Sequence, residues 1–241
     1  MERQTESSAA STEPQDSAKI CQAIPGCAVP VDIVLQSSDG HFFGAHSKNL
    51  EWFTEGFPMA GSTTPSQIVP LAEKSTTLGY FLKFTHNHPA PDLSPMNVDQ
   101  LLALAEAADK YCNSFALAAC RQPMQLLATQ SCEDALKILR FKLIHQDFEG
   151  VEPIAIRTIK LPIIHVLEFF GREHGSESVR WVHFRQRWQE HTEQYNKKLK
   201  IQQSQTFSFG RHGDNCSDKI SPLRKVLETE LPSLERFNIL A

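Results

Sequence analysis

The chain has 241 residues, of which 41% are hydrophobic and 22% are charged, and its formal net charge is −4. This length can hold one large or two small domains. No run approaches the roughly 18 apolar residues that a membrane span needs, and the slight negative charge does not favour general nucleic-acid binding. The acidic start, rich in Ser and Thr, lacks a secretory signal pattern. We therefore expect an intracellular protein, in the cytoplasm or the nucleus.

Residues 1–28 contain Ser, Thr, Gln, Glu and Pro and few large apolar side chains, which predicts a disordered tail. Residues 31–50 then predict a β-hairpin that leads into a helix. Val31, Ile33 and Leu35 alternate with their neighbours as in a strand with one buried face. Asp39-Gly40 tolerates positive φ and is typical of a hairpin turn. Ser47 is expected to cap a short helix, which carries Leu50, Trp52 and Phe53 and ends near Gly56 and the Phe57-Pro58 step.

Residues 67–71 predict a third strand, which must lie at an edge or end at Pro70 because proline cannot donate to a ladder. An amphipathic helix follows, with Ser75 or Thr76 expected as its cap. The next helix begins after Asn97, where Gln100 can complete a capping box. Asn113 and Ser114 interrupt the chain before a further helix. This order predicts an α+β domain in which helices cluster against a small three-stranded sheet.

Several motifs in this region occur in a characteristic order. They are Asp32 and Val34, Gly40 and Phe42, Ala45 and His46, Leu50, Leu71 and Glu73, Phe81 and Phe84, Ala105, Ala108, Tyr111 and Cys120. In order and spacing the chain resembles the BTB/POZ domains over roughly residues 30–128, and the run from Ala107 to Tyr111 is most similar to the fungal group. The resemblance implies a BTB/POZ fold with structural roles for Asp32, Gly40, His46, Leu50 and Tyr111.

By resemblance, the domain is a non-catalytic protein-interaction module for homo- or hetero-oligomerisation, and some members act as adaptors in ubiquitin-ligase or transcriptional complexes. The expected protein-binding residues are Trp52, Phe53, Phe57 and Met59. Cullin-binding members carry an apolar-x-Glu element where this chain has Met59-Ala60-Gly61, so the glutamate is missing. Ser47 follows His46 where strand-exchanging members have a basic residue, which favours a smaller, non-swapped interface.

Residues 129–200 predict an α-helical extension, and residues 201–241 predict a linker with one weak C-terminal helix. Trp181, Phe184, Trp188 and Tyr195 form an aromatic stripe at helical spacing, which is typical of packing. The basic residues between 180 and 200 support an alternative interpretation, in which the extension is a nucleic-acid-associated effector.

Catalytic and metal motifs are weak in this sequence, and we expect no enzyme, cofactor, metal site or small-molecule substrate. Asp32, His46 and Ser47 contain the residue types of a hydrolase triad, but no oxyanion-hole motif accompanies them. His86 and His88 are expected in a solvated loop. No CxxC pair occurs, and Cys112 and Cys120 are expected to be buried free thiols.

Overall fold

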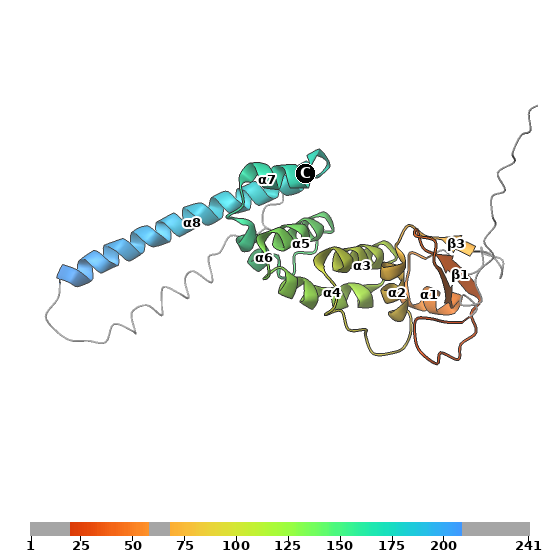
Figure 1. The fold of residues 1–241 in the computed structure, drawn as a ribbon. Coiled ribbons are helices and arrows are strands. Elements are labelled where there is room, and N and C mark those ends of the chain that lie inside the picture. The colour runs from red at the N-terminus through yellow and green to blue at the C-terminus, as the bar shows by residue number, and fades with distance from the viewer. Residues whose placement is uncertain (1–19, 58–67, 209–241) are drawn as a thin grey trace, which may run out of the picture. The chain divides into compact units, whose positions relative to one another are not determined.

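The computed structural model describes residues 20–57 and 68–208. The chain forms two compact units with a boundary between Met124 and Gln125 (Figure 1). The first unit is mixed α and β, and the second is helical within the part that the structure describes. This confirms the predicted α+β class and the helical extension, whereas the BTB/POZ identity stays a prediction. None of the described helices is both long and apolar enough to cross a membrane.

A three-stranded sheet opens the first unit. β1 (Ile33–Gln36) pairs antiparallel with β2 (Phe42–Ala45) and parallel with β3 (Ile68–Pro70), in the order β2-β1-β3. Ile33 and Leu35 are buried as the alternation predicts. Gly40 adopts a φ of +82° in the hairpin turn, a conformation that glycine reaches without steric cost. β3 is an edge strand that ends at Pro70, so the constraint predicted from proline is confirmed.

Within the described residues of the first unit, the sheet is followed by four helices: α1 (Ser47–Phe53), α2 (Ser75–Lys83), α3 (Val98–Lys110) and α4 (Ser114–Leu127), of which α4 runs across the boundary. α2 packs against α3 (Figure 1). Asn97 and Gln100 form the predicted capping box. The Asn113 side chain accepts a hydrogen bond from the Ala116 N–H at 2.9 Å, which restarts the helix where the sequence predicts.

The N-termini of α1 and α2 are capped from the hairpin, and not by the serines that were expected to cap them. The backbone N–H and hydroxyl of Ser47 both donate to the Asp32 carboxylate. The same two groups of Ser75 donate to the Asp39 carboxylate at 2.8 and 2.6 Å. A carboxylate at a helix N-terminus satisfies an unpaired N–H and is favoured by the helix dipole. The predicted capping residues are therefore wrong. Both serines lie inside their helices and donate hydrogen bonds to the aspartates that cap them.

Residues 20–28 pack onto the first unit, so the predicted tail is wrong for this part of its range. Cys21 forms an isolated parallel bridge with Gly44 of β2, and both Cys21 and Ala23 are buried. Residues 1–19 of the predicted tail lie outside the described residues.

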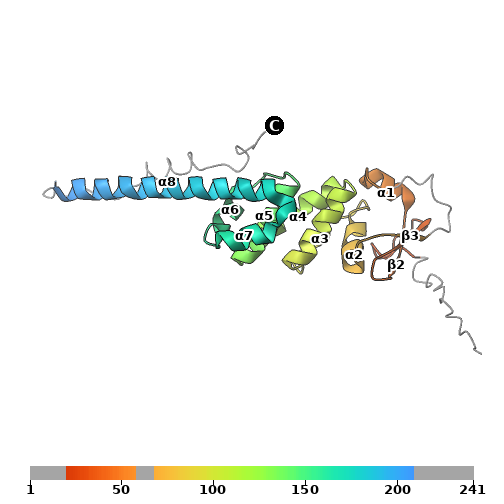
Figure 2. The ribbon, with the colours of Figure 1, turned by 90° about the horizontal axis from the view of Figure 1, so that it is seen from above.

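The second unit contains α5 (Cys132–Ile144), α6 (Val151–Thr158), α7 (Ile163–Phe170), a 3-10 turn at Arg172–His174 and α8 (Gly175–Ser208). α5 packs against α6, and α8 extends far beyond both (Figure 2). Trp181 and Phe184 are fully buried, while Trp188 and Tyr195 are half-buried, so the stripe packs at its N-terminal end. Residues 201–208 are helical, which corrects the linker predicted from residue 201; residues 209–241 lie outside the described part.

Two buried polar contacts hold the second unit together. The Trp181 Nε1–H donates to the Thr158 hydroxyl at 2.8 Å and fixes α8 against α6. Lys142 of α5 is only 1% exposed, and its ammonium donates to the Asp147 carboxylate at 2.7 Å and to the Glu149 carbonyl at 2.9 Å. A buried ammonium is tolerated only when it is paired in this way.

Candidate protein-binding surface and a cysteine-histidine cluster

An exposed aromatic surface lies at the end of α1. Trp52 is 84% exposed, and Phe115 at the start of α4 is 66% exposed. The half-buried ring of Phe53 lies between core and solvent and meets the ring of Phe115 edge-to-face, with 6.1 Å between the centroids. We call Trp52, Phe53 and Phe115 the α1 aromatic surface. Sequence reasoning named Trp52 and Phe53 but missed Phe115, which is distant in sequence and is placed beside Phe53 only by the fold.

The other two predicted anchors differ in outcome. Phe57 is only 7% exposed, and its ring packs on Tyr111 with 4.9 Å between the centroids. The expectation that Phe57 is a surface anchor is therefore corrected: it is a core residue that attaches the chain after α1 to the end of α3. Met59 lies outside the described residues.

The α1 helix is held in place by contacts at both of its ends. Asp32 caps its first turn, and Leu50 is buried beneath it. At the C-terminal end, the Thr54 hydroxyl donates to the Leu50 carbonyl at 2.6 Å. The Gly56 N–H then donates to the Tyr111 carbonyl at 3.2 Å. The aromatic residues are thus displayed from a fixed helix, which lowers the entropy lost when a partner binds.

Tyr111 also joins the end of α3 to the chain after β3 through Glu73. The Tyr111 hydroxyl and the Lys110 ammonium each donate to the Glu73 carboxylate at 2.8 Å. Burial opposes ionisation of Glu73, but the two donors outweigh it and hold the pKa of Glu73 below its ordinary value. Burial, reinforced by the adjacent carboxylate, raises the pKa of Tyr111 to about 12. These shifts fit a structural network in which an ionised Glu73 pairs with Lys110 and accepts a hydrogen bond from Tyr111.

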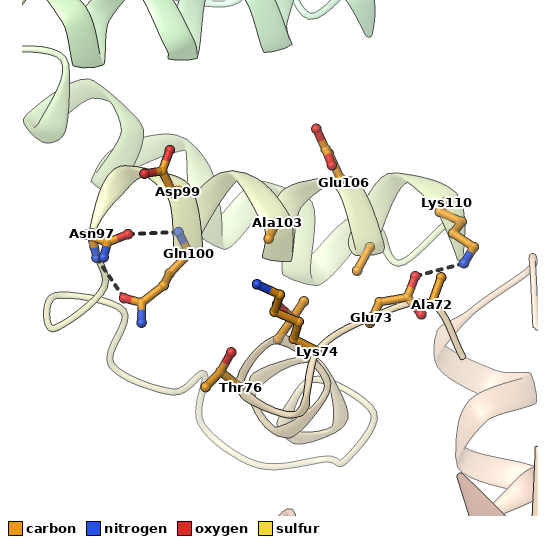
Figure 3. A pocket seen from close by; sticks show the side chains of 12 residues that line it. Ala72, Glu73, Lys74, Thr76, Asn97, Asp99, Gln100, Ala103, Glu106 and Lys110 are labelled. Atoms are coloured by element: carbon orange, nitrogen blue, oxygen red, sulfur yellow. Dashed lines mark hydrogen bonds and ion pairs between the residues drawn. The ribbon is translucent and has the colours of Figure 1, made fainter. Parts of the chain in front are cut away.

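A shallow groove of about 530 Å³ lies between α2 and α3 (Figure 3). Its polar groups are already used at both ends: Asn97 and Gln100 bind each other in the capping box, and Glu73 binds Lys110. Lys74 and Thr76 line the side formed by the start of α2. These pairs stabilise the start and the end of α3.

The three residues of hydrolase-triad type do not form a triad. The Ser47 hydroxyl donates to Asp32, not to a histidine. His46 precedes Ser47 in the sequence, but its ring nitrogens contact other groups. Its Nδ1 lies 2.8 Å from the Pro30 carbonyl, and its Nε2 lies 3.4 Å from the Cys27 sulfur. The residues expected to have structural roles all occupy such positions in the first unit. Asp32 caps α1 and Gly40 lies in the hairpin turn, while the buried residues are His46, Leu50 and Tyr111.

Two cysteines and two histidines converge near the sheet, a cluster that the sequence analysis did not predict. Cys21, Cys27, His46 and His86 each offer a ligand atom, and all four atoms lie within 4.8 Å of one another. His86 therefore lies against Cys21 and not in the solvated loop that was expected; His88 is exposed as predicted. We call these four residues the Cys-His cluster. Its members come from three separate segments, and Cys21 and Cys27, six residues apart in one of them, do not have the short spacing of a common zinc motif.

The remaining thiols are only partly as expected. Cys120 is fully buried, and burial raises its pKa to about 12. Cys112 is exposed and has a φ of +53°, because it lies in the turn between α3 and α4. Its predicted burial is therefore wrong.

The basic residues of α8 are divided between internal and solvent-facing positions. The guanidinium of Arg180 lies 5.1 Å from the ring centroid of Phe148, and that of Arg185 lies 5.4 Å from Trp181. Lys197, Lys198 and Lys200 are exposed. Two arginines of the predicted basic set thus stabilise the packing of α8 through cation–π contacts.

No protein-family model matches the chain, and no curated protein matches its sequence.

Proposed function

We propose that the chain is a non-catalytic protein-interaction module that self-associates through the α1 aromatic surface. The observation that carries this proposal is Trp52, a tryptophan that is 84% exposed on a helix fixed at both ends. Large aromatic side chains at the centre of an interface provide most of its binding energy. The resemblance of the first unit to the BTB/POZ domains, which form homo- and hetero-oligomers, supports the same function.

The free energy of removing the Trp52 ring from water favours its burial against a partner. Covering a tryptophan that is 84% exposed removes about 150–200 Å² of largely apolar surface from water, worth about 4 kcal/mol at roughly 25 cal/mol per Å². In a symmetric dimer the gain occurs twice, and Phe53 and Phe115 add to it. A two-fold interface places the same surface on both copies, so one patch per chain is sufficient.

The test measures self-association of the full chain by sedimentation equilibrium, with Trp52→Ala and Phe115→Ala as variants. Each should weaken the dimer by about 100-fold or more, since every substitution removes two contacts per dimer and each hot spot contributes about 2 kcal/mol. Unchanged association in both variants would rule out this surface. Circular dichroism should show the same helix content in all proteins, because both side chains point to solvent.

The adaptor role is a finer proposal and has a separate test. A cullin N-terminal region mixed with the purified chain should give a complex by light scattering if the chain is a ubiquitin-ligase adaptor. No complex at micromolar concentrations would remove that role and leave self-association standing.

The alternative, a nucleic-acid-associated effector, would depend on the exposed lysines near the end of α8. It predicts a shift of labelled DNA that weakens steeply with salt. Arg180 and Arg185 already contact aromatic rings. Fewer basic side chains of α8 are therefore left to contact phosphate groups, and this favours the interaction module over the alternative.

A further inference from the structure

From the geometry of the Cys-His cluster we infer that Cys21, Cys27, His46 and His86 bind one Zn²⁺ ion as a structural site. This inference does not depend on the proposed function. It is carried by the convergence of four soft or borderline ligands and by the orientation of both imidazoles.

The distances suit tetrahedral coordination. The Cys21 sulfur lies 3.3 Å from the His86 Nε2, and the Cys27 sulfur lies 3.4 Å from the His46 Nε2. Zinc bonds of about 2.3 Å to sulfur and about 2.0–2.1 Å to nitrogen place a sulfur and a nitrogen ligand roughly 3.5 Å apart in a tetrahedron. All four ligand atoms lie within 4.8 Å of one another, so shifts of about an ångström close the site.

Both histidines are oriented for binding through Nε2. The His46 Nδ1 lies 2.8 Å from the Pro30 carbonyl, and the His86 Nδ1 lies 2.9 Å from the Leu82 carbonyl. A carbonyl oxygen can only accept, so each Nδ1 carries the proton and each Nε2 keeps its lone pair. This carbonyl contact on the far nitrogen is the usual second partner of a zinc-bound histidine, since it fixes the tautomer and the ring. In both rings the lone pair is directed at a cysteine sulfur.

The burial of the cluster also fits a metal site. Cys21 is 7% exposed and His46 is 2% exposed, while Cys27 and His86 are only partly exposed. A bound cation deprotonates a coordinating thiol. Binding by two thiolates and two neutral imidazoles releases two protons to solvent.

Such a site would connect three parts of the first unit. In the N-terminal part, Cys21 forms an isolated bridge with Gly44, and the Cys27 N–H donates to the Ile24 carbonyl at 3.2 Å. His46 precedes α1, and His86 follows α2. The metal would fasten the N-terminal segment to both helices, and its binding free energy would add directly to folding. Two thiolates with two imidazoles favour zinc over magnesium or calcium, which prefer oxygen ligands.

The test uses the full chain, produced with zinc in the medium and purified under reducing conditions. Elemental analysis should find about one zinc per chain. Cys27→Ser and His86→Gln should each lower the bound zinc at least about ten-fold after dialysis against a weak chelator. The matched controls Cys132→Ser and His88→Gln, both exposed and outside the cluster, should keep it. Cys216→Ser, beyond the described residues, should also keep it.

Cobalt substitution of the wild-type chain keeps the test decisive even if a variant fails to fold. Co²⁺ in this site should give a thiolate charge-transfer band and the intense visible bands of tetrahedral coordination, and Zn²⁺ should abolish both. Absence of these bands, substoichiometric zinc in the wild type, or full zinc in both ligand variants would overturn the inference. A Cys21–Cys27 disulfide in protein alkylated at the moment of cell lysis would overturn it as well, because the ligands would then be consumed.

Discussion

Replacing Tyr111 by phenylalanine tests the joint between α3 and the chain after β3. The variant keeps the buried ring and its contact with Phe57, and it loses only the hydroxyl that donates to Glu73 at 2.8 Å. A hydrogen bond to a charged group contributes about 1.5–3 kcal/mol. Because 1.36 kcal/mol corresponds to a factor of ten, amide hydrogens of α3 should exchange about ten- to hundred-fold faster.

The assay is native-state hydrogen exchange of the full chain by mass spectrometry, which reports the opening of one region and does not require the two units to unfold together. Tyr80→Phe on α2 is the matched control and should change the opening free energy by less than about 0.5 kcal/mol. The refuting result is a Tyr111→Phe variant whose α3 peptides exchange at the wild-type rate.

The same variant has a predicted pH dependence. The folded pKa of Glu73 lies below its ordinary value, so the carboxylate stabilises the fold fully above the unfolded pKa of about 4.3. That contribution is lost as the pH falls through the lower, folded pKa. The difference between wild type and Tyr111→Phe, compared at equal pH, should therefore shrink on acidification, and a difference that stays constant from neutral to acidic pH would contradict the assigned charge on Glu73.

Two further predictions concern the second unit. Asp147→Ala should destabilise it by about 3–5 kcal/mol because the buried Lys142 ammonium loses its counter-ion, whereas the double variant Lys142→Met with Asp147→Ala should be close to neutral. Urea unfolding followed by circular dichroism separates these cases, and equal losses would be inconsistent with the pairing. Thr158→Val should cost about 1–3 kcal/mol by leaving the Trp181 N–H without its acceptor, and an unchanged thermal midpoint would show that this contact does not hold α8.

The features that could be predicted from the sequence have local causes. Gly40 marks the hairpin because its positive φ is a property of glycine, and Pro70 limits β3 because proline has no N–H. The capping box of Asn97 and Gln100 depends on residues three positions apart. Each of these signals is contained within one element, so the order of strands and helices in the first unit followed from the sequence.

Most of the features that sequence reasoning missed are non-local. Asp32 and Asp39 cap helices that begin well after them in the chain, so each helix start looked as if its own serine were the cap. Phe57 looked exposed beside a proline, but Tyr111 from the end of α3 covers it. The Cys-His cluster joins three segments, and only Cys21 and Cys27 are near each other in the sequence. Burial and convergence of this kind depend on tertiary packing, which no local pattern specifies.

The most direct measurement of the central claim is the mass of the full chain by light scattering over a range of concentrations, for wild type, Trp52→Asp and Ile164→Asp. Ile164, on α7, is the control because it is 66% exposed, as Phe115 is, but lies outside the α1 aromatic surface. The account predicts that wild type and Ile164→Asp rise to twice the chain mass of 27.1 kDa, while Trp52→Asp stays at the mass of one chain. A wild-type protein that remains monomeric up to about 100 μM, or a Trp52→Asp variant that dimerises as the wild type does, would contradict it.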